Sequence, residues 1–303
     1  MSIPCDLIEK ILQLLPVKYV LRARCVSKEW CSLIDTKAFA KNHFKRAIKR
    51  FHITGVLICG VKNFSRLISR VVKDGFVMLN PATRKFRDIH CENSQKVWCY
   101  GFGYDRSTDD YKVVKIRWFE HRGEVEVYGF RSNSWKRLQD IIAGDCSFLS
   151  SRGILVSDSL YWIGFDDTCL VYGFDLGFEE FRKFPLPELN VKWYSICLSN
   201  LDGQLCITDN YRGSHTNVWI LNNFGAENPW RKVYTVEKPD YGSFRYIVKV
   251  VAASESGDDV LFEGDRTKLF WYNLGEKAFM DDVQGIPARF NTLLYTESLV
   301  QVS

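Results

Sequence analysis

Four pairs of neighbouring aspartates are the residues of this sequence best suited to acid–base chemistry or metal binding: Asp109-Asp110, Asp166-Asp167, Asp258-Asp259 and Asp281-Asp282. Either role requires carboxylates that converge on one point. Each pair instead stands in a polar stretch between apolar runs, where aspartate is favoured because its side chain bonds the nearby backbone. We therefore interpret the pairs as turn residues. We expect no catalytic residue, no metal and no cofactor.

Other patterns that could support chemistry are incomplete. Gly101-Phe102-Gly103 lacks the spacing of a phosphate-binding loop, and no serine or cysteine stands in the setting of a nucleophile. The ten cysteines form no CxxC pair, and the five histidines complete no ligand set around them. No signal peptide precedes Asp6, and no apolar run is long enough to span a bilayer. We expect reduced core cysteines in a protein of the cytoplasm and nucleus that does not bind membranes.

The first forty residues are predicted to be helical. Their apolar residues recur with the spacing of an amphipathic helix at Leu7, Ile8, Ile11, Leu12, Leu14 and Leu15, and Pro16 ends this pattern. Shorter helices are expected over 20–26 and 28–34, the latter with Ser27 as its N-cap. So small a unit cannot bury all of its apolar residues. Part of its surface is therefore predicted to be an interface.

This stretch resembles the F-box, the module that docks proteins onto the SKP-type adaptor of cullin-based ubiquitin ligases. The likeness is carried by Ile3-Pro4, Asp6-Leu7-Ile8, Ile11-Leu12, Leu15-Pro16-Val17, Leu21-Arg22, Cys25-Val26, Lys28, Trp30, Leu33-Ile34 and Phe39. The resemblance implies an adaptor contact made by Pro4, Ile8, Leu12, Leu15, Pro16, Val26 and Trp30. The alternative is an ordinary helical cap on the domain that follows.

Positive charge is concentrated in the same region. Residues 1–50 contain eleven Lys or Arg against four acids, within a chain of formal net charge +5. The basic residues near Lys45 lie opposite Phe44 and Ile48 on a predicted helix, so no aromatic residues are interleaved with them as base stacking requires. A solvated helix face or an acidic protein partner fits this pattern better than nucleic acid.

From residue 52 the pattern changes to alternating strands that repeat. Five segments share an apolar strand, a polar turn and an aromatic residue, and the aromatics are separated by 49, 46, 49 and 49 positions: Phe86, Trp135, Phe181, Trp230 and Phe279. This period predicts an all-β propeller of kelch-like repeats, with five repeats visible and five or six blades. Each aromatic should pack on the neighbouring sheet, and the inner strands are expected at 111–114, 160–162, 205–207 and 260–262. The ring is expected to close by pairing of a strand near 293–302 with one near 56–59.

This half resembles the F-box-associated interaction domain of plant F-box proteins, the type-1 or kelch-like class. The likeness is carried by Asn80-Pro81-Ala82-Thr83-Arg84, Gly101-Phe102-Gly103-Tyr104-Asp105, Asp110-Tyr111-Lys112-Val113-Val114, Asn133-Ser134-Trp135, Leu201-Asp202-Gly203-Gln204-Leu205-Cys206 and Glu297-Ser298-Leu299-Val300. Residues 51–75 are shorter than is usual in that class. The resemblance implies adaptor-binding helices in 1–50 and a substrate-recognition propeller in 51–303.

Together the two resemblances imply a non-catalytic subunit of an SCF-type ubiquitin ligase, with a SKP-type adaptor, cullin and RING protein as partners and a target in plant defence, stress or reproductive signalling. Tryptophans 135, 162, 219, 230 and 271 are expected in blade cores. Aromatics in segments that interrupt the repeat are the candidate target contacts: Trp118, Phe119, Trp193, Tyr194 and Tyr211. The alternative is a stand-alone propeller that binds carbohydrate or a small molecule, with structural helices only.

Overall fold

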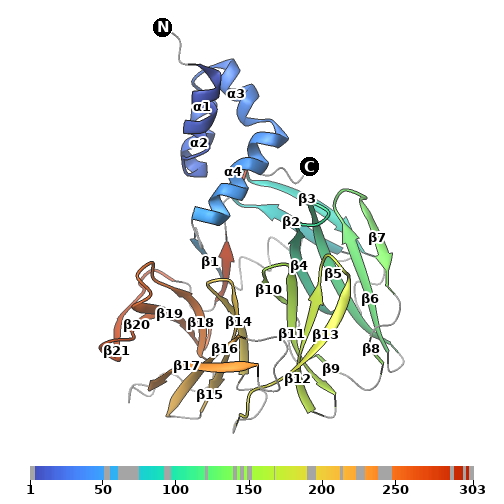
Figure 1. Ribbon diagram of the computed structural model, residues 1–303, viewed down its shortest axis with the longest axis vertical. Coiled ribbons are helices and arrows are strands. Elements are labelled where there is room, and N and C mark those ends of the chain that lie inside the picture. The colour runs from blue at the N-terminus through green and yellow to red at the C-terminus, as the bar shows by residue number, and fades with distance from the viewer. Residues whose placement is uncertain are drawn as a thin grey trace. The chain divides into compact units, whose positions relative to one another are not determined.

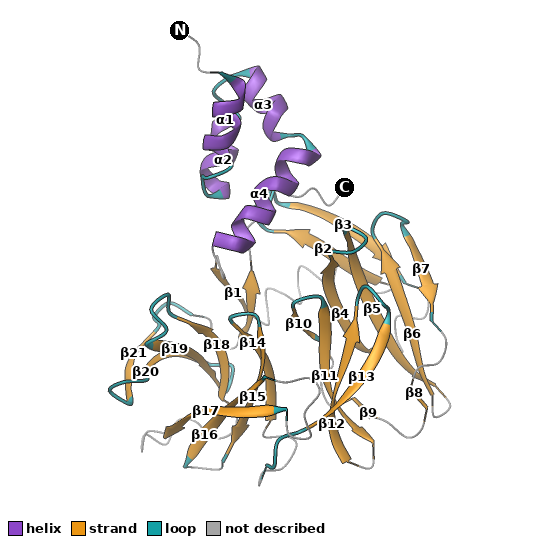
Figure 2. Ribbon diagram, viewed as in Figure 1, coloured by secondary structure: helices purple, strands orange, loops and turns teal. Residues whose placement is uncertain are grey.

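The computed structural model shows N-terminal helices followed by antiparallel strands (Figures 1 and 2). The chain divides into two compact units, Met1–Ser94 with Asn291–Ser303, and Gln95–Phe290. The structure describes residues 4–50, 55–60, 75–91, 97–119, 122–138, 142–143, 147–148, 152–166, 168–189, 196–211, 214–222, 229–237, 248–286, 290–295 and 298–299.

Four helices begin the first unit: α1 (Cys5–Leu12), α2 (Val17–Ala23), α3 (Lys28–Ile34) and α4 (Lys37–Arg50). The predicted cap of α3 is confirmed, because the Ser27 Oγ accepts a hydrogen bond from the Trp30 backbone N–H at 3.2 Å. Helix α2 begins three residues earlier than predicted. Pro16 is its N-cap residue, where the missing N–H of proline costs nothing. None of the described helices is long and apolar enough to cross a membrane.

The C-terminal segment is part of the same unit. Leu299 is buried in the helical core together with Leu12, Val20 and Phe39. The Asn80 side chain donates a buried hydrogen bond to the Ser298 carbonyl at 2.9 Å, while its oxygen accepts from the backbone N–H of the following turn. The Asn-Pro motif therefore ties the end of the chain to the hairpin of β2 (Gly75–Asn80) and β3 (Lys85–His90).

Strand β1 (Gly55–Gly60) pairs with β22 (Phe290–Tyr295), as predicted for the first and last strands. The described residues of the second unit form four antiparallel sheets, each built on a meander of four strands. Short strands β8 (Ile142–Ala143) and β9 (Ser147–Phe148) are added to the first and second of these. The four meanders are β4 (Val97–Asp105), β5 (Asp110–Phe119), β6 (Arg122–Gly129), β7 (Ser134–Arg137); β10 (Ile154–Val156), β11 (Ser159–Asp166), β12 (Thr168–Asp175), β13 (Glu180–Pro185); β14 (Ile196–Leu201), β15 (Gln204–Asn210), β16 (His215–Leu221), β17 (Trp230–Glu237); and β18 (Val248–Ala253), β19 (Asp259–Gly264), β20 (Lys268–Asn273), β21 (Ala278–Asp282).

These sheets pack around their first strands. Strands β4, β10, β14 and β18 contact one another in sequence order, and three buried apolar clusters fill the spaces between consecutive sheets. This is the radial packing of a propeller. The segments expected to be the inner strands form β5, β11, β15 and β19, which are the second strands of their sheets. That prediction was wrong by one strand; two of the innermost strands give a weak local signal, because β4 contains two glycines and β10 has only three residues.

Close approach explains the glycines of β4. A Cβ added at Gly101 would lie 2.6 Å from Leu160 Cδ1, and one at Gly103 would lie 2.5 Å from Leu176 Cδ1, both on the next sheet. Real Cβ atoms do not come so near to a packed side chain. The Gly-Phe-Gly segment of β4 therefore allows two sheets to pack closely, and it is part of a strand and not a phosphate-binding loop.

Three of the four repeated aromatics of the second unit pack between sheets. Trp230 is buried in the cluster between its own sheet and the preceding one, and its Nε1–H donates to the Pro185 carbonyl at 2.7 Å. Phe181 and Phe279 are partly buried against the corresponding clusters. Phe86 contradicts the prediction, because 64% of it is exposed. Ile89, three residues further along β3, is buried, so the alternation of the strand turns Phe86 to the opposite face.

Turn geometry repeats along with the aromatics. The residue two positions before the aromatic has φ between +52° and +57° in four of the repeats, at Arg84, Asn133, Glu179 and Lys277. Two aspartate pairs adjoin turns: Asp110 begins β5 and accepts from the Arg131 backbone N–H, and Asp259 begins β19 and accepts from the Asn273 side-chain amide. Asp281-Asp282 instead end β21, where Asp282 lies 3.3 Å from the Lys268 Nζ. The cysteines do not all lie in the core: Cys5 and Cys25 are exposed on the helices, whereas Cys91, Cys99 and Cys206 are buried.

Candidate functional site

Helix α1 and the turn after it carry two apolar stripes. Ile8 and Leu15 are partly buried, and Leu12 is only 1% exposed, so this stripe packs on the core of the helices. Leu7, Ile11 and Leu14 have the same spacing, shifted by one residue, and are 50%, 53% and 53% exposed. A helix that is apolar on two sides has more apolar surface than its own module covers.

The predicted adaptor residues therefore separate into two groups. Trp30 packs with Ile8, Leu12 and Leu15 on the helical core, while Pro4, Pro16 and Val26 are exposed. The stripe of Ile8, Leu12 and Leu15, predicted to contact the adaptor, packs on the helical core of this chain, and its adaptor contact stays a prediction. Spacing alone does not say which of two stripes faces inward. We define the outer stripe as Leu7, Ile11 and Leu14.

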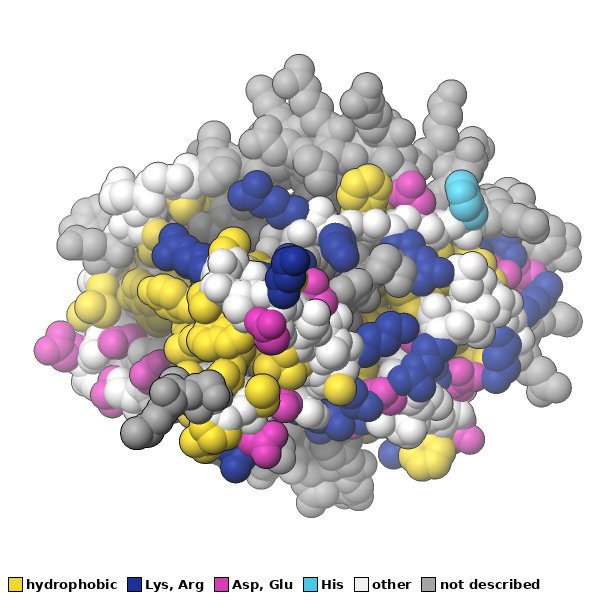
Figure 3. Space-filling view, turned by 90° about the horizontal axis from the view of Figure 1, so that it is seen from above, with side chains coloured by type: hydrophobic (Ala, Val, Ile, Leu, Met, Phe, Trp, Pro, Cys, Tyr) yellow, Lys and Arg dark blue, Asp and Glu magenta, His cyan; other side chains and the backbone are white. Residues whose placement is uncertain are grey.

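Two further apolar side chains on the helices are exposed. Tyr19 on α2 is 51% exposed and Val26, just after α2, is 64% exposed. Figure 3, a space-filling view from above, shows hydrophobic side chains gathered on part of the face that it displays. Burying apolar surface contributes roughly 25 cal/mol per Å². The exposed apolar side chains of the helices thus suit a protein partner.

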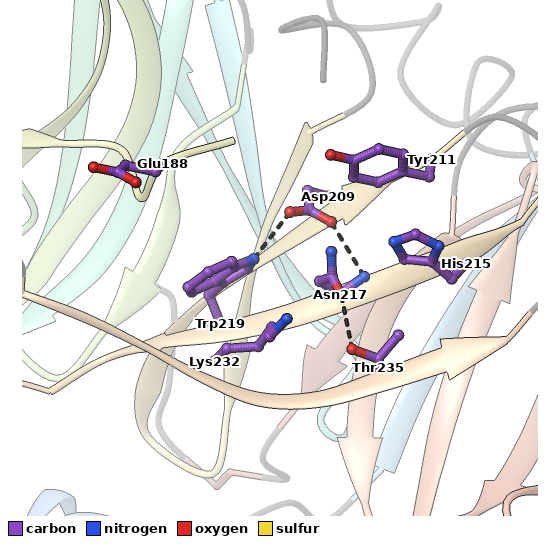
Figure 4. A pocket seen from close by; sticks show the side chains of 8 residues that line it. All are labelled: Glu188, Asp209, Tyr211, His215, Asn217, Trp219, Lys232 and Thr235. Carbon is purple, nitrogen blue, oxygen red and sulfur yellow. Dashed lines mark hydrogen bonds between the residues drawn. The ribbon is translucent and has the colours of Figure 1, made fainter. Parts of the chain in front are cut away.

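A second candidate site is a pocket of about 430 Å³ in the second unit (Figure 4). Strands β15, β16 and β17 and the segment after β13 provide its lining, which consists of Glu188, Asp209, Tyr211, His215, Asn217, Trp219, Lys232 and Thr235. His215, Asn217 and Trp219 alternate along β16 and so share one face of the sheet.

A β-bulge completes this face. Asn217 pairs with Thr235 and Trp219 with Lys232, so Val233 is an extra residue in β17. Lys232 and Thr235 are three positions apart, and in a regular strand they would lie on opposite faces. The bulge restores both to the pocket side of the sheet.

A buried carboxylate holds the floor of the pocket together. Asp209 is 1% exposed and accepts two hydrogen bonds, from the Trp219 Nε1–H at 3.0 Å and the Asn217 backbone N–H at 3.2 Å. The Asn217 side-chain oxygen in turn accepts from the Thr235 hydroxyl at 2.7 Å. Figure 4 shows this chain of bonds running across the three strands. It fixes the orientation of the indole ring.

Aromatic rings form the walls of the pocket. The rings of Tyr211 and His215 stack with centroids 4.5 Å apart and an interplanar angle of 18°. The Lys232 Nζ lies 5.6 Å from the centroid of the Trp219 ring, within the range of a cation–π contact. Trp219 was expected in a blade core, but it packs on the core with only part of its surface and presents the rest to the pocket.

Of the five predicted target contacts, Tyr211 lines this pocket. Trp118 and Phe119 end β5 at a hairpin, where Phe119 pairs with Arg122, and their side chains lie outside the described part of the structure. Trp193 and Tyr194 lie outside the described residues. Sequence reasoning missed Asp209, His215 and Asn217, although polar residues at every second position beside Trp219 were a usable signal.

A group of buried charges elsewhere in the second unit is structural. The Lys112 Nζ lies 3.0 Å from a carboxylate oxygen of Asp105 and 3.0 Å from one of Glu179, which is on the next sheet. Burial opposes the ionisation of Asp105, but hydrogen bonds from Thr108, Ser107 and Lys112 outweigh it and hold the pKa of this carboxyl well below its usual range. These three charged residues join two sheets. Their hydrogen bonds and ion pairs within the protein leave none of them available for chemistry. In the described residues, no three or more His, Cys, Asp or Glu side chains form a group that could hold a metal.

Comparison with known proteins agrees with this architecture. The family model of the F-box domain matches residues 1–42, and that of the F-box associated beta propeller domain matches residues 26–302. The F-box protein CPR1 of Arabidopsis thaliana is 27% identical over 368 residues, covering 99% of this chain and 89% of that protein. The F-box/kelch-repeat protein At3g23880 of the same plant is 26% identical over 289 residues, covering 78% of this chain and 79% of that protein.

Among solved structures, the Dos1 propeller is 12% identical with a TM-score of 0.41, covering 70% of this chain and 54% of that one, and this likeness is too distant to add to the argument. The two family models together cover the helices, the four meanders and the paired terminal strands. The chain belongs to the F-box proteins that carry an F-box associated beta propeller domain.

Proposed function

We propose that this protein is the substrate-recognition subunit of an SCF-type ubiquitin ligase. Its helices dock on a SKP-type adaptor, and through it on the cullin and RING protein, while the propeller binds a target protein for ubiquitination and degradation. The protein itself breaks no bond in this proposal. Its contribution is to raise the effective concentration of a target lysine at the ligase and to orient it.

The observation that carries the proposal is the outer stripe of α1. Leu7, Ile11 and Leu14 lie on one face of an F-box and are about half exposed, although the same helix already supplies the module with a full inner stripe. Exposed apolar surface of this kind marks an interaction site. The excess of basic residues in 1–50 favours an acidic partner.

Adaptor binding tests the proposal directly. We expect Ile11→Asp to abolish co-purification with a plant SKP-type adaptor, because a charge would be buried in the interface. The free chain should fold as before, since Ile11 is 53% exposed in it. Met280→Asp is the matched control, because this side chain on β21 is 51% exposed and lies outside the F-box. Ile11→Asp that still captures the adaptor as wild type does would refute the assigned surface.

The finer features belong to the same proposal. We infer kelch-type blades, five or six in number, from the repeat of about 49 residues, and target recognition by loops of the propeller. Residence in the cytoplasm and nucleus follows from the expected ligase partners, and a fluorescent fusion in plant cells tests it. A signal confined to another compartment would contradict this part of the proposal.

A further inference from the structure

The pocket on sheet β14–β17 has an excess of negative groups. Asp209 on its floor accepts hydrogen bonds from neutral donors only, and no described residue forms an ion pair with it. Glu188 on the rim is exposed and likewise has no ion-pair partner among the described residues. Lys232 is the one ammonium in the lining. A buried carboxylate without a counter-charge favours a cation nearby.

The chain already places a cation in this pocket. Lys232 is exposed, and its Nζ lies over the Trp219 ring, whose Nε1–H donates to Asp209. The face of the Trp219 ring and the Asp209 carboxylate at its edge thus both favour positive charge in the pocket. The contact with the Trp219 ring is the only ring or charge contact that the described structure gives the Lys232 side chain. This side chain can therefore be displaced.

We propose that this pocket binds an arginine side chain of the target protein. A guanidinium group is planar, stacks on aromatic faces and pairs with carboxylates in a fixed geometry, which matches the rings of Trp219 and Tyr211 and the Glu188 carboxylate at the rim, while Asp209 adds a buried negative charge. The inference rests on the proposed function in taking the ligand from a target protein. In Figure 4 the Glu188 carboxylate points away from the other lining residues, so its pairing with the arginine requires this exposed side chain to adopt another rotamer.

This assignment gives two lining residues, Lys232 and Glu188, opposite effects on binding. Lys232 occupies the ring face that the arginine needs and repels it, so its removal strengthens binding. Glu188 attracts the arginine, so its neutralisation weakens binding. An anion, such as an acidic or phosphorylated side chain, would show the reverse signs at both positions.

The test uses the full-length chain and N-acetyl-arginine amide as the probe, with N-acetyl-citrulline amide as its neutral analogue of the same shape. Binding is followed by the NMR signal of the Trp219 indole N–H, assigned by its loss in Trp219→Phe among the nine tryptophans. We expect a Kd on the order of 1 mM for the arginine compound. Citrulline should bind at least tenfold more weakly.

The variants follow from the charges. Lys232→Ala should tighten arginine binding about threefold to fivefold, and Glu188→Gln should weaken it by a similar factor, as for an exposed ion pair. Lys183→Ala is the matched control, because the Lys183 Nζ lies 5.5 Å from the Tyr172 ring centroid on another sheet, outside the pocket. It should leave the affinity unchanged.

Three results would overturn the inference: no shift of the Trp219 signal at saturating arginine, equal binding of citrulline, or binding of N-acetyl-glutamate amide that Lys232→Ala abolishes. Co-purification with the adaptor is measured on the same preparations. A chain that binds the adaptor but not arginine refutes the pocket alone, whereas one that binds arginine but no adaptor refutes the ligase proposal.

Discussion

Substitution of Asp105 by asparagine should make the second unit both less stable and less sensitive to acid. Asp105 ends β4 and is 1% exposed. Its carboxylate accepts from the Ser107 hydroxyl at 2.7 Å and the Thr108 hydroxyl at 2.6 Å, and lies 3.0 Å from the Lys112 Nζ. Removing one partner of a buried ion pair leaves the other charge uncompensated. We expect Asp105→Asn to lower the free energy of unfolding by about 3 kcal/mol at neutral pH, near the lower limit for such changes because Glu179 still pairs with Lys112.

The pH dependence has a definite sign. The pKa of Asp105 is lowered in the folded protein, whereas an unfolded aspartate has a pKa of about 3.9. As the pH falls, the unfolded chain takes up the proton first, so the stability supplied by this carboxyl is complete above its unfolded pKa and is lost below it. At pH 3 such a carboxyl is ionised in the folded protein but largely protonated in the unfolded chain. The free energy of unfolding therefore falls by roughly 1.3 kcal/mol between pH 6 and pH 3.

Urea unfolding of wild type and Asp105→Asn, followed by tryptophan fluorescence from pH 6 to pH 3, measures both effects. The difference in the free energy of unfolding should shrink toward low pH, because only the wild type loses the contribution of this group. Glu276→Gln removes an exposed acid from another turn and serves as the control. A difference between wild type and Asp105→Asn that stays constant across this range would refute the assignment of the pH dependence to Asp105.

Three further substitutions test the packing. Ser27→Ala removes the cap of α3 and should cost about 1 kcal/mol of helical stability, seen as a lower melting temperature by circular dichroism. Gly101→Ala would bring a Cβ to 2.6 Å from Leu160 Cδ1, so we expect a loss of about 1–3 kcal/mol in urea unfolding; an unchanged midpoint would contradict the close contact of the sheets. Trp230→Phe keeps an aromatic ring but removes the donor to the Pro185 carbonyl, and should cost about 1 kcal/mol.

The repeat was the most reliable guide to the fold. A spacing of about 49 residues between aromatics located the outer strands of the sheets, because Phe181, Trp230 and Phe279 each pack in a cluster between two sheets of the second unit. The same reasoning failed at Phe86. A repeat of residue types does not state which face of a strand is inside, and the buried neighbour Ile89 decides this in β3.

The innermost strands and the orientation of α1 could not be read from local pattern. Strand β4 contains Gly101 and Gly103, residues that weaken any strand prediction, yet close packing against the next sheet requires them. In α1 the inner and outer stripes have identical spacing, and only the packing of α2 to α4 selects Leu12 for the interior. Both features depend on elements distant in the sequence.

The pocket shows the same limit at the scale of one residue. Tyr211 could be chosen from the sequence because Tyr in a loop is a common recognition residue, but Lys232 and Thr235 could not be placed together. Their spacing of three predicts opposite faces for a regular strand, and the extra residue Val233 reverses that prediction. A bulge is a property of the pairing between β16 and β17, so it leaves no period in β17 alone. Strand register thus brings Lys232 and Thr235 to the same side of the sheet. A sequence can therefore predict its fold correctly without predicting such a site.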